Sequence, residues 1–224
     1  SLYEKQLASY PRTDCRYLPA EQKPQACAVL KKTVLQALPE KGRQVLSLEA
    51  DWKAKDYIYD SSKVAEHHGL VPTGKLPQAG ALSREEEVAW QALVEHFART
   101  LLPHHEYIET TVGFEAQGCA FARKARTSLN WEQSWRLFDD RPEEVALPKL
   151  ADAAQAVIES VRLQEGKTTP PQRYTEATLA ADMEAAAKFA TDERIKARLK
   201  ETSGIGTAAT RAAIIEKLKA KGML

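Results

Sequence analysis

Apolar residues recur at every fourth position in the first part of the chain. The recurrence covers Ala26, Leu30, Val34 and Leu38. Because residues four apart share one face of an α-helix, this spacing predicts a helix over residues 19–38. Pro24 fits such a helix only in the first turn, where the N–H that proline lacks would have no partner.

Signals for the start and the end of a second helix occur between Ser83 and Pro103. Ser83 is followed three residues later by Glu86, which is the pattern of a capping box. Apolar residues then continue at helical spacing to Leu102, and Pro103 ends the pattern. The shorter apolar run at residues 45–48 does not favour one type of element.

Strand-like composition replaces the helical pattern in the middle of the chain. Residues 107–114 are rich in Thr, Val, Ile and Tyr, and residues 119–126 form a second such run after Gln117-Gly118. The two runs predict strands joined by a turn. Val157, Val161 and Leu163 suggest a further strand at residues 156–163.

The last part of the chain returns to helical patterning after a linker, GKTTPPQRYT, that contains two prolines. Helices are predicted over residues 176–190, 192–201 and 207–221. Thr207 is the predicted N-cap of the last helix.

These patterns predict an α+β multidomain chain in three parts. Residues 1–106 form a helical domain, residues 107–172 a β-rich domain and residues 173–224 a second helical domain. No run of about 18 apolar residues occurs, so no membrane span is expected. The start lacks both a methionine and the layout of a signal peptide, and we expect a segment of a longer protein.

Charge and cysteine content narrow the chemistry. The formal net charge is +1, but residues 193–224 hold eight Lys and Arg against three Asp and Glu. Such a local excess suits a phosphate backbone, although a solvated helix face is the commoner reason for it. Three cysteines without C-x-x-C spacing predict free thiols, no disulfide frame and no zinc site.

The stretch SYPRTDCRYLP, near the start, contains a first candidate for chemistry. In Tyr10-Pro11-Arg12 the proline fixes the backbone between a phenol and a guanidinium. A phenol is a weak nucleophile at neutral pH because its pKa is about 10. It becomes useful against a phosphodiester when cations neutralise the developing charge, and the planar fork of arginine holds two phosphate oxygens. A half-buried tyrosine beside a surface arginine would show the same spacing.

Two further stretches contain candidate residues. EHHGLVPTG carries His67 and His68, which are suited to acid–base work or to a hydrogen bond to phosphate, although one of them could be structural. SGIGTAATRAAII places a glycine turn before a helix, where free backbone N–H groups and the helix dipole favour phosphate. Glycine turns before helices are common, so this second signal is weak alone.

Taken in order, the three stretches resemble the type IA DNA topoisomerases, closest to the topoisomerase III branch. SYPRTDCRYLP is similar to the nucleophile motif of that family, Y-P-R-[ST]-D-[SC]-x-Y-L. EHHGLVPTG is similar to the family motif A-H-[HE]-A-I-x-P-[ST], with Gly69 where alanine is usual. The segments from RYTEATLAADMEAAAKF to the end of the chain resemble the part of the family that returns from the arch into the base.

The resemblance implies a fold and a reaction. Residues 1–106 would be the helical gate domain that carries the catalytic tyrosine, 107–172 the β-rich arch or hinge, and 173–224 the DNA-binding start of the base domain in a toroid. Tyr10 would attack one DNA strand and form a 5′-phosphotyrosyl link, and the enzyme would pass a strand and reseal the first. Arg12 would stabilise the scissile phosphate, and His67 would assist the chemistry.

The resemblance also implies partners. Residues expected to contact single-stranded DNA are His68, Gly204, Gly206, Thr207, Thr210, Arg211 and Lys221. No metal site is expected in this chain, because the Mg²⁺-binding acidic Toprim domain of the family precedes the tyrosine and would be missing here. We therefore expect the isolated segment to be inactive in relaxation. A bacterial, cytoplasmic, nucleoid-associated enzyme without membrane or ATP is implied, and no G-x-x-x-x-G-K-[ST] motif occurs.

Two alternatives remain. Residues 192–201 and 207–221 could form a helix-turn-helix in a non-enzymatic module, which would bind duplex DNA by sequence. A tyrosine recombinase also joins a phenol to phosphate, but its tyrosine is C-terminal, whereas this motif is near the start of the chain.

Overall fold

The computed structural model describes residues 1–64 and 66–223, and the chain divides into two compact units. The first unit comprises Ser1–Pro11 and Cys15–Asp152. The second comprises Arg12–Asp14 and the chain from Ala153 onward. Within the described ranges there are six α-helices and one two-stranded sheet, which confirms the α+β class. The division at residues 106 and 172 stays a prediction.

The predicted helix over residues 19–38 is present in two forms. A 3-10 turn, Ala20–Gln25, contains Pro24 and leads into α1 (Ala26–Ala37). The tighter turn fits a proline that cannot donate a backbone hydrogen bond. The face of α1 that holds Leu30 and Val34 is fully buried, as the four-residue spacing predicts.

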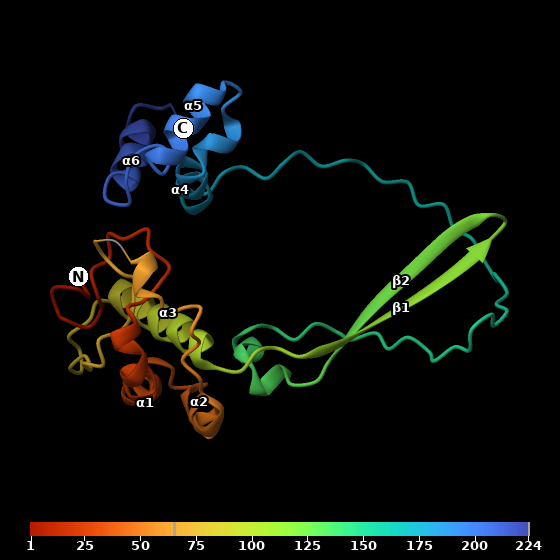
Figure 1. The fold of residues 1–224 in the computed structure, drawn as a ribbon, viewed down its shortest axis with the longest axis horizontal. Helices are drawn as coiled ribbons and strands as arrows, with labels where there is room; N and C mark the ends of the chain where they lie inside the picture. The colour runs from red at the N-terminus through yellow and green to blue at the C-terminus, as the bar shows by residue number, and fades with distance from the viewer. Residues whose placement is uncertain (65, 224) are drawn as a thin grey trace. The chain divides into compact units, whose positions relative to one another are not determined.

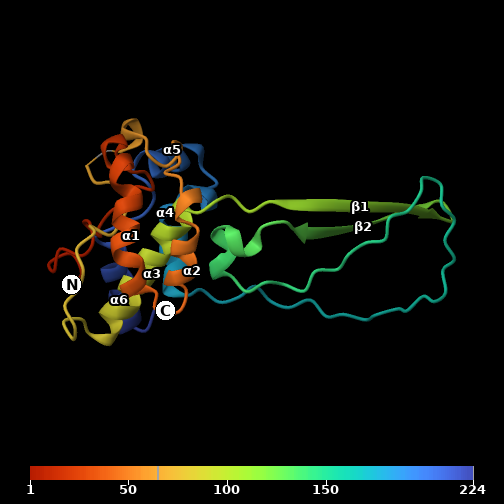
Figure 2. The same cartoon turned by 90° about the horizontal axis from the view of Figure 1, so that it is seen from below.

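The capping box at Ser83 is confirmed. The Glu86 N–H donates to Ser83 Oγ at 3.3 Å, and the Ser83 N–H donates to Glu86 Oε2 at 3.1 Å. These two hydrogen bonds cap the start of α3 (Arg84–Leu101), which packs against α1 (Figure 2). The apolar run at residues 45–48 is mostly helical, in α2 (Gly42–Ser47). The core of the first unit lies among these three helices.

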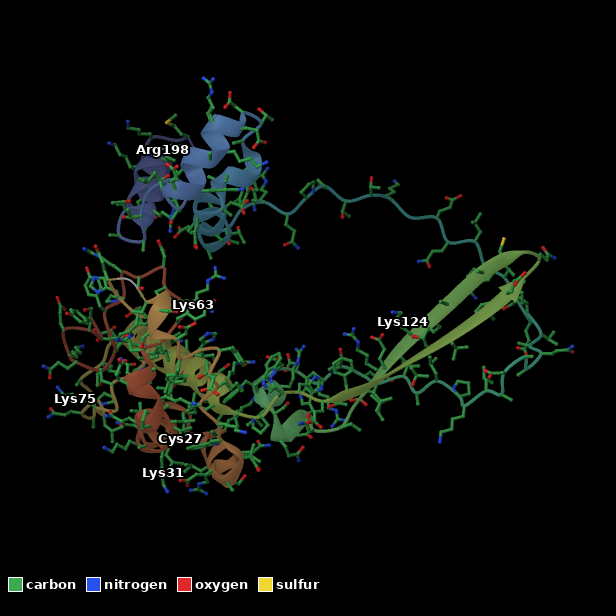
Figure 3. All side chains as sticks on the ribbon, in the orientation of Figure 1. Cys27, Lys31, Lys63, Lys75, Lys124 and Arg198 are labelled. Atoms are coloured by element: carbon green, nitrogen blue, oxygen red, sulfur yellow. The ribbon has the colours of Figure 1, made fainter. Side chains whose placement is uncertain are left out.

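The predicted strand pair forms a hairpin (Figure 1). Strands β1 (Tyr107–Ala116) and β2 (Cys119–Ser128) run antiparallel, and Lys124 marks β2 in Figure 3. Gln117 and Gly118 have φ angles of 51° and 75°, as a two-residue hairpin turn of type I′ requires. Phe114 and Phe121 stack across the strands with ring centroids 4.9 Å apart.

The strand predicted at residues 156–163 is wrong. Residues 140–175 contain neither helix nor strand, and their side chains project from a bare trace in Figure 3. Val157, Val161 and Leu163 are each nearly nine-tenths exposed, at 88%, 87% and 89%. A strand needs a hydrogen-bonding neighbour, and the sheet that the described residues form contains only β1 and β2.

Three helices make up most of the second unit. These are α4 (Glu176–Glu184), α5 (Glu193–Glu201) and α6 (Arg211–Ala220). The predicted helix over residues 176–190 breaks into α4 and a 3-10 turn, Ala186–Phe189. The helix predicted at 192–201 is confirmed, and Asp192 caps α5 by accepting from the N–H groups of Arg194 and Ile195.

The last helix begins four residues later than predicted. Its N-cap is Thr210, so the N-cap assignment of Thr207 is wrong. Helix α6 packs mainly on α4, and α5 packs on the 3-10 turn that follows α4. This arrangement differs from a helix-turn-helix, in which the two consecutive helices form the packed pair. None of the described helices is both long and apolar enough to cross a membrane.

Candidate functional site

The loop that carries Tyr10 is paired with the loop that follows the two histidines. The Ser9 N–H donates to the Val71 carbonyl at 2.9 Å, and the Val71 N–H donates to Ser9 Oγ at 2.9 Å. An antiparallel bridge joins Ala8 to Pro72 beside them. Two stretches that are about sixty residues apart in the sequence are therefore held in fixed register.

This pairing brings Tyr10 and His67 together. Their ring centroids are 4.4 Å apart and their planes are inclined by 42°. The ring of Tyr3 meets Tyr10 edge-on from a centroid distance of 5.3 Å. Tyr10 is half-buried and His67 is exposed, so the pair is positioned by neighbours yet open to a large substrate. The catalytic roles of both residues stay predictions.

His68 contacts its own loop and Gln22. Its Nδ1 lies 2.8 Å from the Gly69 carbonyl oxygen, and its Nε2 lies 3.0 Å from the Gln22 amide nitrogen. A carbonyl oxygen only accepts, so Nδ1 donates, and a neutral ring then accepts from Gln22 through Nε2. Both ring nitrogens are engaged within the protein. The predicted contact of His68 with DNA stays a prediction.

Gly69 lies where the two loops meet the chain around Cys15. Its N–H donates to the Tyr17 carbonyl at 2.8 Å. A Cβ at this position would lie 3.3 Å from the Cys15 carbonyl oxygen and 3.4 Å from that of Tyr17. The alanine that is usual in the resembling motif would therefore require a shift of a few tenths of an ångström.

Arg12 is exposed and lies in the Arg12–Asp14 segment, which belongs to the second unit. Within that unit Asp14 forms an ion pair with Arg211, with Oδ1 and Nη1 3.0 Å apart. The role of Arg12 as a phosphate clamp stays a prediction.

The glycine turn of the second unit is built for close packing. Gly204 and Gly206 have φ angles of 88° and 70°, in the region that favours glycine. A Cβ on Gly204 would lie 2.1 Å from the Met183 carbonyl oxygen, which no side chain tolerates. The Gly204 N–H already donates to the Leu199 carbonyl at 2.7 Å. Gly204 thus packs the turn against the end of α4, and DNA contacts of both glycines stay predictions.

Arg211 organises the same turn, a role that the sequence analysis missed. Its side chain is only 6% exposed. Nε donates to the Ile205 carbonyl at 3.2 Å, and Nη2 donates to the carbonyls of Ser203 at 2.8 Å and Gly206 at 3.3 Å. The sequence did contain a signal for this structural role. It was an arginine in the first turn of a helix, just after a glycine turn whose carbonyls need donors. Its predicted DNA contact stays a prediction.

The remaining predicted DNA contacts lie on the surface. Thr207 and Thr210 are exposed, and the Thr207 N–H donates to Thr210 Oγ1 at 2.8 Å. Lys221 is exposed at the C-terminal end of α6. Across residues 1–64 and 66–223, no group of three or more His, Cys, Asp or Glu is placed to hold a metal ion. Among the described residues Cys15, Cys27 and Cys119 form no disulfide, and burial raises the pKa of the Cys27 thiol.

Comparison with known proteins supports the motifs. A family model described as DNA topoisomerase matches residues 1–224. The chain is 33% identical to DNA topoisomerase 3 of Vibrio cholerae over its whole length, and covers 35% of that protein. It is 36% identical to DNA topoisomerase 3 of Bacillus licheniformis and 32% identical to that of Staphylococcus aureus, with 97% of the chain and 31% of each relative covered.

The chain thus spans about a third of the length of the curated relatives that it matches. The match extends across both compact units and includes the paired loops around Tyr10 and His67. The chain belongs to the DNA topoisomerase family and is a type IA, topoisomerase III-like segment.

Proposed function

We propose that this chain supplies the nucleophile of a type IA topoisomerase. The contact between Tyr10 and His67, at 4.4 Å between ring centroids, is the observation that carries the proposal. Tyr10 Oη attacks a DNA phosphorus, so a Tyr10–phosphate ester forms and the bond to the 3′-oxygen breaks. The phenol loses its proton, and the departing 3′-oxygen takes up one proton and leaves as a hydroxyl, so protons balance. The reverse reaction reseals the strand, so the bond energy is conserved without ATP.

The neighbours of Tyr10 supply positioning in this scheme. The two Ser9–Val71 hydrogen bonds fix the backbone just before Tyr10 and a few residues after His67, and the edge-on ring of Tyr3 limits the rotation of the phenol. His67 would orient the phenol and donate a hydrogen bond to the phosphate, which its ring contact with Tyr10 supports. Arg12 would stabilise the charge that develops on the phosphate. Positioning of this kind contributes to catalysis because the reactants need not find the geometry at each turnover.

The second unit is proposed to bind the single strand. Arg194, Lys200, Lys217 and Lys221 are exposed cations on or beside α5 and α6. Contacts from such residues to phosphates are independent of sequence and weaken steeply with salt. The three parts, at residues 1–106, 107–172 and 173–224, would then serve as gate, arch or hinge, and base.

Type IA topoisomerases generally depend on Mg²⁺, and the described residues do not gather a metal site. The resemblance to the family supports the proposal that an acidic Toprim domain outside these residues would hold the metal, and we derive no step through it. A metal there would add to the neutralisation of the phosphate charge that is proposed for Arg12.

A trapping experiment tests the proposal. The longest natural polypeptide that contains these residues is incubated with Mg²⁺ and a single-stranded oligonucleotide labelled at its 3′ end, then quenched with denaturant. The label is expected to remain on Tyr10, because cleavage leaves the 5′ phosphate on the enzyme. Tyr10→Phe should abolish the adduct and leave binding of the single strand within about twofold.

Tyr3→Phe is the matched control, since it removes a nearby phenol oxygen and keeps the ring that touches Tyr10. It should still form the adduct. Label on any residue other than Tyr10 would refute the assignment. Tight binding to one duplex sequence, unchanged in Tyr10→Phe and without any adduct, would instead favour the helix-turn-helix alternative.

A further inference from the structure

A cavity lies behind the reacting pair within the first unit. Its volume is about 230 Å³, below the range typical of sites for drug-sized ligands. Its lining comes from both paired loops and from the helices beneath them: Ser9, Leu18, Gln22, Gln25, Ala26, Val29, Tyr59, His68, Val71, Pro72, Thr73 and Phe97.

The cavity and the reacting pair share the same two loops. Ser9 lines the cavity and the next residue, Tyr10, contacts His67. His68 lines the cavity, and the residue before it is His67. A ligand in the cavity would therefore contact the backbone that positions both reacting side chains.

One polar group in the lining has no protein partner. Only 6% of the Tyr59 surface is exposed. Among the described residues its hydroxyl forms no hydrogen bond. Burial raises the pKa of Tyr59 to about 12, so the hydroxyl is a neutral donor at physiological pH. An unpaired buried hydroxyl costs free energy, and a ligand that accepts its hydrogen bond would recover that cost.

The chemistry of the lining selects a neutral, partly apolar ligand. None of the described residues that line the cavity is Lys, Arg, Asp or Glu. A phosphate would lose its hydration there without gaining a cation, so the cavity does not suit the DNA backbone. Val29, Val71 and Pro72 offer apolar surface, Phe97 offers an aromatic ring, and Gln22 and Gln25 offer amide groups.

We propose that this cavity binds one unstacked nucleobase of the single strand on which Tyr10 acts. The inference rests on the proposed function and adds a base-binding site to it. Unstacked bases are held in proteins by hydrogen bonds to their edges and by contact of their faces with apolar or aromatic side chains. The Tyr59 hydroxyl donates to a ring nitrogen or carbonyl oxygen of the base, and the Gln22 and Gln25 amides offer further edge contacts.

An abasic scan measures this site directly. The same long polypeptide carries Tyr10→Phe so that the strand stays intact, and its affinity for a single-stranded oligonucleotide is measured by fluorescence anisotropy. One base at a time is then removed along the oligonucleotide. One position is expected to weaken binding roughly 5- to 100-fold, the range for loss of one base contact. Neighbouring positions should change it less than about threefold.

Two variants link that position to the cavity. Tyr59→Phe keeps the ring and removes the hydroxyl, so the penalty at the sensitive position should shrink while other positions keep their values. Val29→Phe fills the cavity and should abolish the penalty. Val88→Phe is its control, because Val88 on α3 is 60% exposed and outside the cavity. Circular dichroism confirms that each variant is folded, and Tyr59→Phe decides the question if Val29→Phe does not fold.

The outcomes separate this proposal from the one on which it rests. A flat scan, or a penalty that Tyr59→Phe leaves unchanged, overturns the base-binding site even when wild type traps DNA on Tyr10. Failure of trapping with a positive scan instead refutes the catalytic proposal alone. Free deoxynucleosides are tested in parallel by thermal shift. If they stabilise wild type and not Val29→Phe while the scan is flat, the ligand is a free nucleobase and the assignment to the DNA strand is wrong.

Discussion

The two units of this chain are stabilised in different ways. The first unit buries Leu30, Val34, Val94 and Leu101 completely, within one hydrophobic core among α1, α2 and α3. In the described part of the second unit, the buried side chains are Ala186, Ile215 and Arg211. One unit therefore depends on burial of apolar surface, whereas the other depends on a buried arginine and a glycine turn.

The difference follows from size and composition. A few short helices with basic surfaces cannot bury much apolar area, and small domains usually need an additional constraint. In the second unit the planar fork of Arg211 supplies it, by joining three carbonyl oxygens of one turn. An ion pair between Lys219 and Glu176, at 2.6 Å, links α6 to α4 at the surface and contributes less.

Tryptophan makes the comparison measurable. All four tryptophans, at positions 52, 90, 131 and 135, belong to the first unit. Tryptophan emission therefore reports unfolding of the first unit, whereas far-ultraviolet circular dichroism reports the helices of both. If the two units unfold independently, the two signals give separate transitions.

The largest effect is expected from truncation of the hydrophobic core. Leu30→Ala should lower the free energy of unfolding of the first unit by about 2–5 kcal/mol, since it leaves a cavity at a fully buried position. Urea unfolding followed by tryptophan emission measures the loss. Leu35→Ala is the matched control on the same helix, where the side chain is 49% exposed, and should cost at most about 0.5 kcal/mol. Equal losses would contradict the assigned core.

A second effect should be confined to the second unit. Arg211→Met keeps most of the side-chain volume but leaves three carbonyls without their donor, which should cost that unit about 2–3 kcal/mol. Arg211→Lys should restore little of the loss, because an ammonium lacks the planar fork. The circular dichroism transition of the second unit should shift while tryptophan emission stays unchanged. An equal shift of both signals would show that the units do not unfold separately.

Close packing of the glycine turn gives a third test. Gly204→Ala adds a Cβ 2.1 Å from the Met183 carbonyl oxygen. It also holds an alanine at a φ of 88°, a backbone conformation that favours glycine. We expect a loss of about 2 kcal/mol in the second unit from strain and displacement together. Gly222→Ala is the control, because it has a φ of 66° and open space around its Cβ. Gly204→Ala should therefore lose more stability than Gly222→Ala because of the close approach, and equal losses would contradict it.

The sequence predicted the elements that pack against a partner and failed where no partner is present. Helical spacing predicted α1 and α3 because their apolar faces meet each other, and the Ser83 capping box was local enough to read directly. The apolar spacing at Val157, Val161 and Leu163 was misleading, since a strand requires a neighbouring strand and the described residues provide none there. A local pattern predicts an element only where a partner surface exists.

Some residues of the candidate site were predictable from the sequence and others were not. Motif order predicted Tyr10 and His67, and the pairing of their loops brings the two rings together. The unpaired hydroxyl of Tyr59 depends on contacts between distant stretches, so no local pattern predicts it. The carbonyls that Arg211 joins lie only five to eight residues before it, so its place just after a glycine turn was a local signal for its structural role. Gly204 packs closely against the Met183 carbonyl, which depends on the fold of the turn onto α4, and its contact with DNA stays a prediction.

The smallest expected effect is the pH dependence of the capping box in the first unit. Hydrogen bonds from Lys5 and from the Ser83 backbone lower the pKa of Glu86 to about 2. Because this pKa lies below the ordinary value of 4.5, the carboxylate stabilises the folded state above about pH 4.5. That contribution is lost as the pH falls towards 2. Glu86→Gln should therefore be less stable than wild type at pH 7, with a difference that narrows at acid pH.

Urea midpoints from tryptophan emission at pH 7, 4 and 2.5 measure the narrowing, and Glu87→Gln is the matched control. Glu87 is exposed in the same first turn of α3 but takes no part in the capping box, so its replacement should leave the midpoints nearly parallel to wild type at all three pH values. A Glu86→Gln difference that persists undiminished at pH 2.5 would mean that the side chain acts through packing rather than through its charge. The first unit would then rely on apolar contacts even at the start of α3, which would sharpen its contrast with the polar, arginine-centred second unit.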